Sequence, residues 1–221
     1  AHGAFYKGRQ VGSIGDLATL SFFVAHNITT GEGGMVFYKD QTLDSMMRSV
    51  REFGRSINFE NRYQSHPQLG EYDSRYIFET LGYNVRMTDF VAAIGLVQLR
   101  YLDRDNSYRR QLAKWYSSCL KDNANISIIP ISPKCESSRH LFQVRVPERD
   151  RVLTELNNVQ IFPGVHYIDN TQYKPYLYGK GTCPNAHKAS NEILSLPMHM
   201  GLTFNDISEI SQSLKDIVDK L

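Results

Sequence analysis

The sequence predicts an α/β protein, and three patterns along its 221 residues indicate this class. An apolar run at Leu17–Val24, bounded by turn residues, is typical of a buried strand. Apolar side chains recur at helical spacing over Thr88–Leu120, which indicates one long helix. Beyond residue 125, short strand-like runs alternate with helix-like runs, as in a small α/β domain of about 100 residues.

The first 40 residues are expected to form strands separated by turns. Glycines at positions 8, 12 and 15 mark turns around a short extended piece. The strand Leu17–Val24 then leads into a turn cluster at Thr29–Gly34, and Met35–Tyr38 is expected to be the next strand. The polar pair Lys39 and Asp40 closes it.

A helix and a long loop are expected next. The helix covers Leu43–Phe53, with Thr42 or Asp44 as its N-cap and Gly54 at its end. The following segment, Arg55–Glu79, is polar and aromatic and has neither helical nor strand periodicity. We therefore expect a loop, and loops of this length inside compact proteins are usually functional or lie at an interface.

The long helix Thr88–Leu120 is expected to link two lobes. Four apolar residues share one of its faces, and three small residues allow a neighbour to approach closely: Phe90, Ile94, Val97 and Tyr101, then Ala92, Ala93 and Gly95. A polar break follows at residues 121–125. The expected later elements are strands Ile126–Ile131, Leu141–Val146 and Val159–Phe162, and helices Arg149–Asn157, Ala186–Leu194 and Phe204–Leu221.

Composition excludes several classes of function. The formal net charge is +2 and no cluster of Lys or Arg stands apart, so no nucleic-acid partner is expected. No apolar run is long enough to cross a bilayer, and Ala1–Gly8 lacks the features of a signal peptide. Three scattered cysteines (Cys119, Cys135, Cys183) form no disulfide framework and have no metal-ligand spacing, so we expect a reducing cytoplasm and no metal.

The residues with the clearest chemical content lie at positions 21–34. Ser21, with its hydroxyl, lies in the predicted apolar strand, and His26, with its imidazole, lies between this strand and a glycine-rich turn. Glycine allows positive φ and a close approach of the backbone, which suits a cofactor or a phosphate but equally suits any tight turn. From these residues alone, a plain turn with a structural histidine is the first interpretation.

Several sequence blocks between residue 1 and residue 203 carry a recognisable pattern. They are residues 1–4, 6–9, 11–13, 15–16, 21–22, 28–35, 81–89, 92–95, 98–99, 164–167 (Gly-Val-His-Tyr), 193–199 (Ile-Leu-Ser-Leu-Pro-Met-His) and 201–203. In kind and order these blocks resemble the DegT/DnrJ/StrS family of sugar aminotransferases, and the resemblance covers nearly the whole chain.

The resemblance implies the fold type I architecture of enzymes that use pyridoxal phosphate. The chain would then hold the C-terminal part of the large cofactor domain (residues 1–87), a linking helix (88–122) and a small C-terminal α/β domain (123–221). Family members are expected to be homodimers with active sites at the interface and to act on nucleotide-activated keto sugars. The aspartate that faces the pyridine nitrogen, the aromatic platform and further phosphate ligands are expected in a preceding segment, the missing N-terminal half of the fold.

His26 departs from the family pattern, because most members carry there the lysine that binds the cofactor covalently. Imidazole cannot form that bond, so the cofactor would be held without a covalent link. Histidine at this place resembles the family's sugar 3-dehydratases, such as GDP-4-keto-6-deoxymannose 3-dehydratase, which use pyridoxamine phosphate. An imidazole can take and return a proton at neutral pH, so His26 is expected to be the catalytic base.

Two further residues match cofactor contacts of the family. Ser21 matches a serine that contacts the cofactor phosphate, and Asn84 matches an asparagine that reaches the phosphate from the partner subunit. The alternatives are a strand hydroxyl bonded locally and an ordinary turn asparagine. Glu32 matches a turn acid, and for Arg86 a structural role ranks ahead of a contact with substrate phosphate.

Three functions remain open at this point. The first is dehydration at C3 of a nucleotide-linked 4-keto-6-deoxy hexose, in deoxy- or amino-sugar biosynthesis such as that of lipopolysaccharide. The second is a retired aminotransferase scaffold that binds or regulates, and the third is amino transfer that uses the histidine. The dehydratases with an iron–sulfur cluster are excluded, because Arg55–Glu79 contains no cysteine. The fragment alone is expected to be inactive.

Overall fold

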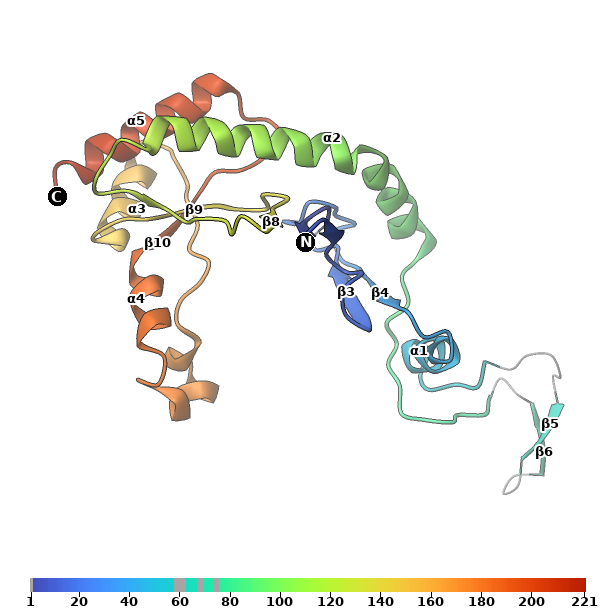
Figure 1. Cartoon of the computed structure of the whole chain (residues 1–221). Helices are drawn as coiled ribbons and strands as arrows, with labels where there is room; N and C mark the ends of the chain where they lie inside the picture. Colours follow the sequence, from blue (N-terminus) through green and yellow to red (C-terminus); the bar gives the residue numbers. More distant parts are fainter. Residues whose placement is uncertain (1, 58–62, 67–69, 74–75) are drawn as a thin grey trace. The chain divides into compact units, whose positions relative to one another are not determined.

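The computed structural model describes residues 2–57, 63–66, 70–73 and 76–221, so Ala1 of the first matching block lies outside the described residues. The chain has the predicted mixed α/β fold (Figure 1). It divides into two compact units, which we call the N-terminal unit (Arg9–Arg100) and the C-terminal unit (Tyr101–Leu221 with Ala1–Gly8). The domain boundaries expected at residues 87–88 and 122–123 stay a prediction.

A three-stranded antiparallel sheet forms the frame of the C-terminal unit. Strand β9 (Phe142–Arg145) is its centre, with β10 (Ile193–Leu196) on one side and β7 (Ser127–Ile128) on the other. In the register, Phe142 lies opposite Leu196, and Val144 lies opposite Leu194 and Ile128. These facing apolar side chains place one continuous row of β9 and β10 residues in the core.

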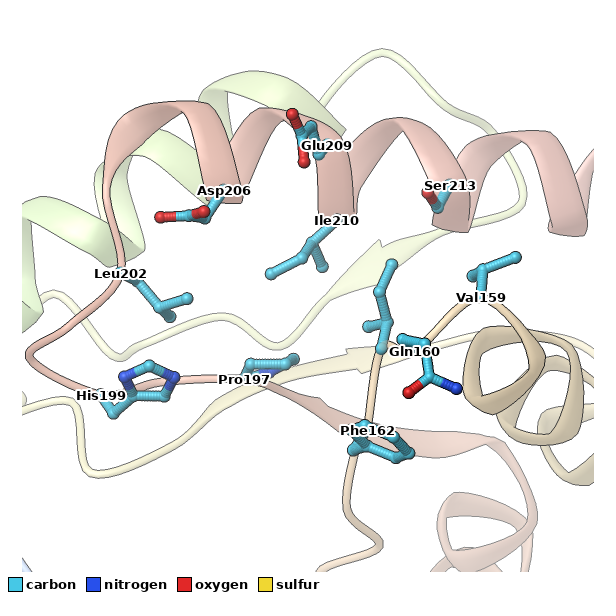
Figure 2. A pocket seen from close by; sticks show the side chains of 11 residues that line it. Val159, Gln160, Phe162, Pro197, His199, Leu202, Asp206, Glu209, Ile210 and Ser213 are labelled. Atoms are coloured by element: carbon cyan, nitrogen blue, oxygen red, sulfur yellow. The ribbon is translucent and has the colours of Figure 1, made fainter.

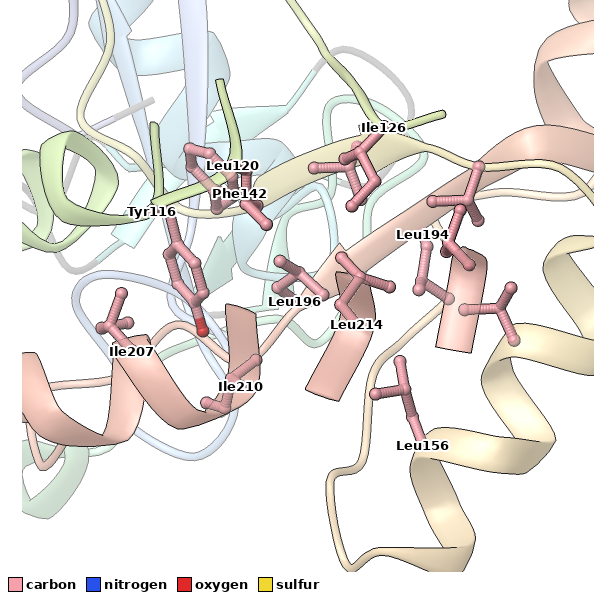
Figure 3. Packing of buried hydrophobic residues seen from close by; sticks show 14 of the residues in the cluster. Tyr116, Leu120, Ile126, Phe142, Leu156, Leu194, Leu196, Ile207, Ile210 and Leu214 are labelled. Carbon is pink, nitrogen blue, oxygen red and sulfur yellow. The ribbon is translucent and has the colours of Figure 1, made fainter. Parts of the chain in front are cut away.

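Helices from distant parts of the sequence cover this sheet with a shared core (Figure 3). The helices that contribute to this core are the second part of α2 (Asp89–Leu120), α3 (Arg149–Asn158) and α5 (Phe204–Val218), while α4 (Pro184–Glu192) contacts α3 and β9. Tyr116 of α2 is fully buried and stacks on Phe142, with 4.8 Å between ring centroids. Its hydroxyl donates to the carbonyl of Pro197 at 2.9 Å, so the buried phenol has its hydrogen-bond partner.

The first residues of the chain belong to the C-terminal unit. Strand β1 (Phe5–Tyr6) pairs antiparallel with β8 (Cys135–Glu136), and buried Asn106 of α2 donates to the carbonyl of His2 at 2.9 Å. A Cβ on Gly3 would lie 2.4 Å from the Asn106 amide, so only glycine fits there. Within the resembling block, His2 and Gly3 thus pack against α2.

Three predicted elements of this unit need correction. Val159–Phe162 is not a strand, because Gln160 has a φ of +62°, in the left-handed region. The predicted helix Ala186–Leu194 ends at Glu192, because Ile193 is extended and begins the β10 pairing with β9. The last helix ends at Val218, three residues before the predicted end at Leu221. In the first two cases backbone geometry or strand pairing overrides apolar periodicity.

The N-terminus of α5 carries a capping box that we expect to matter for stability. Thr203 accepts a hydrogen bond from the backbone N–H of Asp206, whose carboxylate in turn accepts from the Thr203 backbone N–H at 2.6 Å. Thr203→Ala should lower the free energy of unfolding of the C-terminal unit by about 1 kcal/mol. Urea unfolding followed by the fluorescence of Trp115, the one tryptophan of the sequence, measures this.

The same cap predicts how the stability of the C-terminal unit depends on pH. Hydrogen bonds from Thr203 hold the pKa of Asp206 below its ordinary value. A carboxylate with a depressed pKa stabilises the fold above its unfolded pKa, and this contribution is lost as pH falls through the folded value. The Thr203→Ala difference should therefore shrink in acid, and an unchanged difference at pH 2–3 would contradict the capping role.

The N-terminal unit contains a two-stranded antiparallel ribbon. After the short strand β2 (Arg9–Gln10), strand β3 (Leu17–Ser21) pairs with β4 (Gly34–Tyr38), with Leu17 opposite Tyr38 and Ser21 opposite Gly34. The predicted first strand reached Val24, but it ends at Ser21 because the chain turns back at Phe23. Burial was also predicted for this strand. Its residues are instead partly or fully exposed in the chain described, with Leu17 at 43%.

Helix α1 (Leu43–Arg51) follows β4 and ends two residues before the predicted Phe53, and only part of its predicted capping is found. Thr42 occupies the N-cap position without a side-chain cap; its N–H and hydroxyl donate to the carboxylate of Asp40 instead. Asp44 accepts hydrogen bonds from Tyr38 and Arg48. Gly54 does terminate the helix as predicted: its N–H donates to Ser49 at 2.8 Å, and a Cβ there would lie 1.8 Å from the Thr80 carbonyl.

The segment Arg55–Glu79 is only partly the loop that was predicted. Its two ends pair, because the Ser56 N–H donates to Ile77 and the Glu79 N–H donates to Gly54, each at 2.8 Å. Strands β5 (Tyr63–His66) and β6 (Gly70–Asp73) form a hairpin within it. Positions 58–62, 67–69 and 74–75 of the predicted loop lie outside the described residues.

Helix α2 confirms the predicted long helix, with Asp89 as its first residue. It belongs to both units, because the division falls between Arg100 and Tyr101. Its predicted apolar face is exposed in the first part of the helix, with Phe90 at 86% and Ile94 at 49%. Within the described part of the chain, no helix combines the length and apolar content that a bilayer span requires.

Candidate functional site

The loop after β3 places Ser21 and His26 side by side in the N-terminal unit. Beyond the end of β3, the Phe22 N–H donates to the Gly33 carbonyl at 2.9 Å, and the Phe22 carbonyl accepts from Thr30 at 3.0 Å. Phe22 and Ile28 are buried at 7% and 5% exposure. The loop is therefore fastened at its base by backbone hydrogen bonds and packed by two apolar side chains.

Two contacts hold His26 in place, one through its backbone in a tight turn and one through its imidazole ring. The His26 N–H donates to the Phe23 carbonyl at 2.9 Å, and ring Nδ1 lies 3.1 Å from the Ser21 carbonyl oxygen. A carbonyl oxygen only accepts, so this contact requires the hydrogen on Nδ1 and assigns the basic lone pair of the neutral ring to Nε2. The Phe23 ring meets the imidazole edge-on, with 6.0 Å between centroids.

Ser21 contributes a hydroxyl beside this imidazole. Its Oγ accepts a hydrogen bond from the backbone N–H of Phe23 at 3.3 Å, and the residue is exposed. A serine hydroxyl that accepts one bond still has its own hydrogen to donate. Ser21 can therefore donate to an anionic oxygen of a ligand while the Phe23 N–H keeps the hydroxyl in place.

Two threonines that the sequence showed only as turn residues fix the glycine-rich part of the loop. The Thr29 hydroxyl donates to the Phe22 carbonyl and accepts from the Gly31 N–H, and the Thr30 hydroxyl donates to the Glu32 carbonyl at 2.7 Å. Thr30 is 5% exposed. Hydroxyls next to a Gly-x-Gly-Gly turn were the signal for this role, since Ser and Thr commonly bond to nearby backbone groups in turns.

Gly33 is required by the packing of this turn. Its φ is +154°, and a Cβ there would lie 2.5 Å from the Thr30 hydroxyl and 2.8 Å from the Met87 side chain. At Gly31, with a φ of +80°, a Cβ would meet nothing within 4 Å. Gly33 is thus needed because a side chain there would collide with its neighbours, whereas Gly31 leaves open space at the tip of the turn.

Asn84 occupies another place in the N-terminal unit, at the end of α1. Its backbone forms an antiparallel bridge with Glu52, and the residue is exposed. Arg86 follows it and donates to the Glu52 carboxylate at 3.1 Å, with its guanidinium 5.5 Å from the Phe53 ring. These contacts support the structural role that ranked first for Arg86. The structure brings Ser21 and His26 together, whereas Asn84 is fixed beside Glu52.

A pocket of about 540 Å³ lies in the C-terminal unit, between α5 and residues 159–162 (Figure 2). Its lining is mixed, with apolar Phe162, Leu202 and Ile210 beside His199 and Glu209. None of the predicted site residues lines it. Among the described residues, no group of three His, Cys, Asp or Glu side chains could hold a metal ion.

Known proteins resemble this chain along nearly its whole length. A model of the DegT/DnrJ/EryC1/StrS aminotransferase family matches residues 1–215. GDP-perosamine synthase of Caulobacter vibrioides is 32% identical, over 99% of this chain and 57% of that protein. The chain therefore spans a little more than half the length of such relatives.

Solved structures agree with this match. DesV of S. venezuelae superposes with a TM-score of 0.86 at 28% identity, covering 100% of this chain and 56% of that one. The putative sugar aminotransferase Spr1654 of Streptococcus pneumoniae gives 0.84 at 27% identity in its PLP form, again over 100% and 56%. Its PMP form gives 0.82 at 28% identity, over 100% and 57%.

Proposed function

Because this chain belongs to the DegT/DnrJ/EryC1/StrS aminotransferase family, we propose that the protein acts on a nucleotide-activated sugar with the help of pyridoxal or pyridoxamine phosphate. Relatives with solved PLP and PMP forms support the cofactor. GDP-perosamine synthase, a relative named for a nucleotide-linked amino sugar, supports the substrate class. The observation that carries the proposal is the paired hydroxyl and imidazole of Ser21 and His26 at the glycine-rich turn.

The residues at this turn fit a cofactor that is bound without a covalent link. Ser21 offers a hydroxyl to a phosphate oxygen, and the open space at Gly31 leaves room for a close approach of the backbone. Imidazole forms no stable imine, so His26 excludes the covalent attachment that a lysine would provide. The bound cofactor would supply an electron-withdrawing ring to the reaction.

His26 is the residue of this turn that can move a proton. Its Nδ1 is occupied by the Ser21 carbonyl, so protons are exchanged at Nε2. The contact with a backbone oxygen also fixes the ring plane, which positions Nε2 before any substrate binds. Asn84, by family resemblance, would contact the cofactor phosphate of the partner subunit in a homodimer.

Amino transfer is the reaction that the comparisons favour over the dehydration predicted from His26. The matching family is one of aminotransferases, and the Spr1654 structures are described as a sugar aminotransferase. Dehydration at C3 remains the second candidate, because a histidine base without a covalent lysine suits it. In both reactions His26 would carry the proton, so the products distinguish the two.

A product assay on the full-length protein tests this proposal. The protein receives pyridoxal phosphate, glutamate and 4-keto-6-deoxy hexoses linked to UDP, GDP or dTDP, and mass spectrometry follows the sugar. A 4-amino sugar that keeps its C3 hydroxyl supports amino transfer, whereas loss of water from C3 supports dehydration. Bound cofactor with no change in any sugar would overturn both and leave a binding or regulatory subunit.

A second expected result concerns the cofactor link. Borohydride reduction of the cofactor-loaded protein should leave no cofactor attached to the polypeptide, because His26 stands where the covalent lysine is expected. Mass spectrometry of the intact protein and of its peptides measures this. A reduced cofactor adduct on any lysine would contradict the proposed binding mode, and dialysis should remove the cofactor from an unreduced sample.

The exposed apolar residues of the N-terminal unit support the expectation of a preceding segment and of a homodimer. Val36 and Phe37 of the β3–β4 ribbon are 44% and 43% exposed, and Phe90 of α2 is 86% exposed. Exposed apolar surface of this kind marks contacts with other polypeptide. We therefore propose that this chain alone lacks turnover, and that the rest of the enzyme covers these residues.

A further inference from the structure

Gly95 of α2 lies against the turn that holds His26. From the sequence, Ala92, Ala93 and Gly95 were expected to let a neighbour approach this helix closely. The structure identifies the neighbour of Gly95: a Cβ built there would lie 3.1 Å from Cγ2, the methyl carbon of Thr30. Gly95 and Thr30 both belong to the N-terminal unit, so the contact lies within one compact unit.

Thr30 is closely packed on two sides. Its methyl group faces Gly95, and its hydroxyl is so near Gly33 that a Cβ on Gly33 would lie 2.5 Å from it. The hydroxyl also donates to the Glu32 carbonyl at 2.7 Å, which fixes the side-chain torsion and with it the place of the methyl group. Thr30 is only 5% exposed. A larger residue at position 95 would therefore push the whole turn rather than rotate one side chain.

The backbone passes the position of Thr30 on to the imidazole. The Thr30 N–H donates to the Phe22 carbonyl at 3.0 Å, and Phe22 stands between Ser21 and Phe23 in the sequence. These two neighbours supply the carbonyl oxygens that hold His26. The Ser21 oxygen lies 3.1 Å from ring Nδ1, and the Phe23 oxygen accepts from the backbone N–H at 2.9 Å. The contacts thus run from α2 through Thr30 and Phe22 to the two groups that orient the ring.

We propose that Thr30, supported by Gly95 of α2, is a positioning residue that sets the direction of His26 Nε2. This inference rests on the proposed function for the role of His26 in proton transfer. Thr30 acts through the Phe22 carbonyl and not by contact with the cofactor or the sugar. Glycine at position 95 then serves the turn and not the helix, because alanine favours a helix interior more than glycine does.

Gly95→Ala in the full-length protein tests the proposal. The new Cβ lies closer to the Thr30 methyl carbon than side chains normally pack, so the turn has to give by a few tenths of an ångström. Turnover should fall by about tenfold with a smaller change in KM, since a displacement of about 1 Å in a site can cost about 10²-fold. Ser107→Ala, at an exposed position of α2 outside the N-terminal unit, is the matched control and should leave turnover unchanged.

Thr30→Ser supplies the compensating change. Serine keeps the hydroxyl that donates to the Glu32 carbonyl and lacks the methyl group that faces Gly95. The double variant, Gly95→Ala with Thr30→Ser, should regain the turnover of Thr30→Ser alone, because the new Cβ occupies the space that the methyl group leaves. If Gly95→Ala does not fold by itself, the double variant still decides, since it must fold and reach the Thr30→Ser rate.

A second readout needs neither cofactor nor sugar. In cofactor-free protein with isotope-labelled histidine, NMR signals of the His26 ring report which nitrogen carries the hydrogen, and the His26→Asn spectrum assigns them. The unmodified protein should carry the hydrogen on Nδ1, as the contact with the Ser21 carbonyl requires. Gly95→Ala should shift these signals, and the double variant should restore them.

Two results would overturn the proposal. One is turnover, or a His26 ring signal, that Gly95→Ala leaves unchanged. The other is a loss that Thr30→Ser does not restore, which would show that the new Cβ acts elsewhere than on Thr30. A protein that forms no sugar product but gives the expected ring signals in all variants would contradict the proposed reaction only. A product formed by a protein whose ring signals ignore Gly95→Ala would contradict this inference only.

Discussion

Phe142→Ala should lower the free energy of unfolding of the C-terminal unit by about 3–5 kcal/mol, the cost of removing a buried phenyl ring. Phe142 is fully buried at the centre of the sheet and stacks on Tyr116, which is itself fully buried. The change removes apolar contact, leaves a cavity and withdraws the surface that holds the Tyr116 ring. A domain is stable by only about 5–15 kcal/mol, so this one change would remove a large share.

Urea unfolding monitored by Trp115 fluorescence measures this loss. Trp115 packs edge-on against Tyr108 and Phe204, all within the C-terminal unit, so its signal reports the unit that contains Phe142. Val159→Ala is the matched control, since Val159 is 54% exposed in the same unit and should change stability by less than about 0.5 kcal/mol. A Phe142→Ala effect as small as the control would mean that Phe142 is not central to the core.

Helical periodicity predicted the helices that build this core. Leu112, Tyr116 and Leu120 recur at intervals of four on α2, and all three are fully buried. On α5, Ile207, Ile210 and Leu214 follow at intervals of three and four and belong to the same cluster. The apolar spacing identifies the helix, but the face predicted from Phe90 and Ile94 is exposed, so the spacing alone does not say which part of the helix is buried.

Elements that depend on distant pairing could not be predicted from local pattern. Ile193–Leu196 continues the apolar spacing of the helix before it, and only its partner β9, about 50 residues earlier, makes it a strand. At Gln160 a single left-handed residue interrupts what resembles a strand. The exposure of β3 could not be predicted either, because an apolar run indicates a strand but not what packs against it.

The proximity of Ser21 and His26 was predictable from the sequence, and the geometry of their loop was less so. Ser21 and His26 stand at the end of a strand and in the turn after it, so their proximity follows from local sequence. The assignment of the Nδ1 hydrogen to the Ser21 carbonyl does not, because it depends on how the loop closes through Phe23 and Thr30. The roles of Ser21, Asn84 and His26 toward a cofactor stay predictions.

His26→Asn should lower the turnover of the full-length protein by about 10²-fold or more, with a smaller change in KM. The asparagine side-chain N–H₂ can replace Nδ1 as the donor to the Ser21 carbonyl, so the loop keeps its hydrogen bond while the base at Nε2 is lost. The loss then reports proton transfer rather than disruption of the turn. Rates within about threefold of the unmodified protein would remove His26 from the mechanism.

The companion change, His26→Lys, should raise amino transfer, whereas His26→Asn should lower turnover. A lysine amine at this turn can bind the cofactor covalently, so borohydride should now fix the cofactor to residue 26, which the unmodified protein should not allow. Amino-sugar yield from glutamate and the keto sugar should rise, and any loss of water from C3 should fall. A retired scaffold would show no turnover before the change, and an aminotransferase that uses histidine would form the amino sugar both before and after it. If neither the covalent link nor the product ratio changes, residue 26 does not face the cofactor, and the turn that holds Ser21 and His26 is structural.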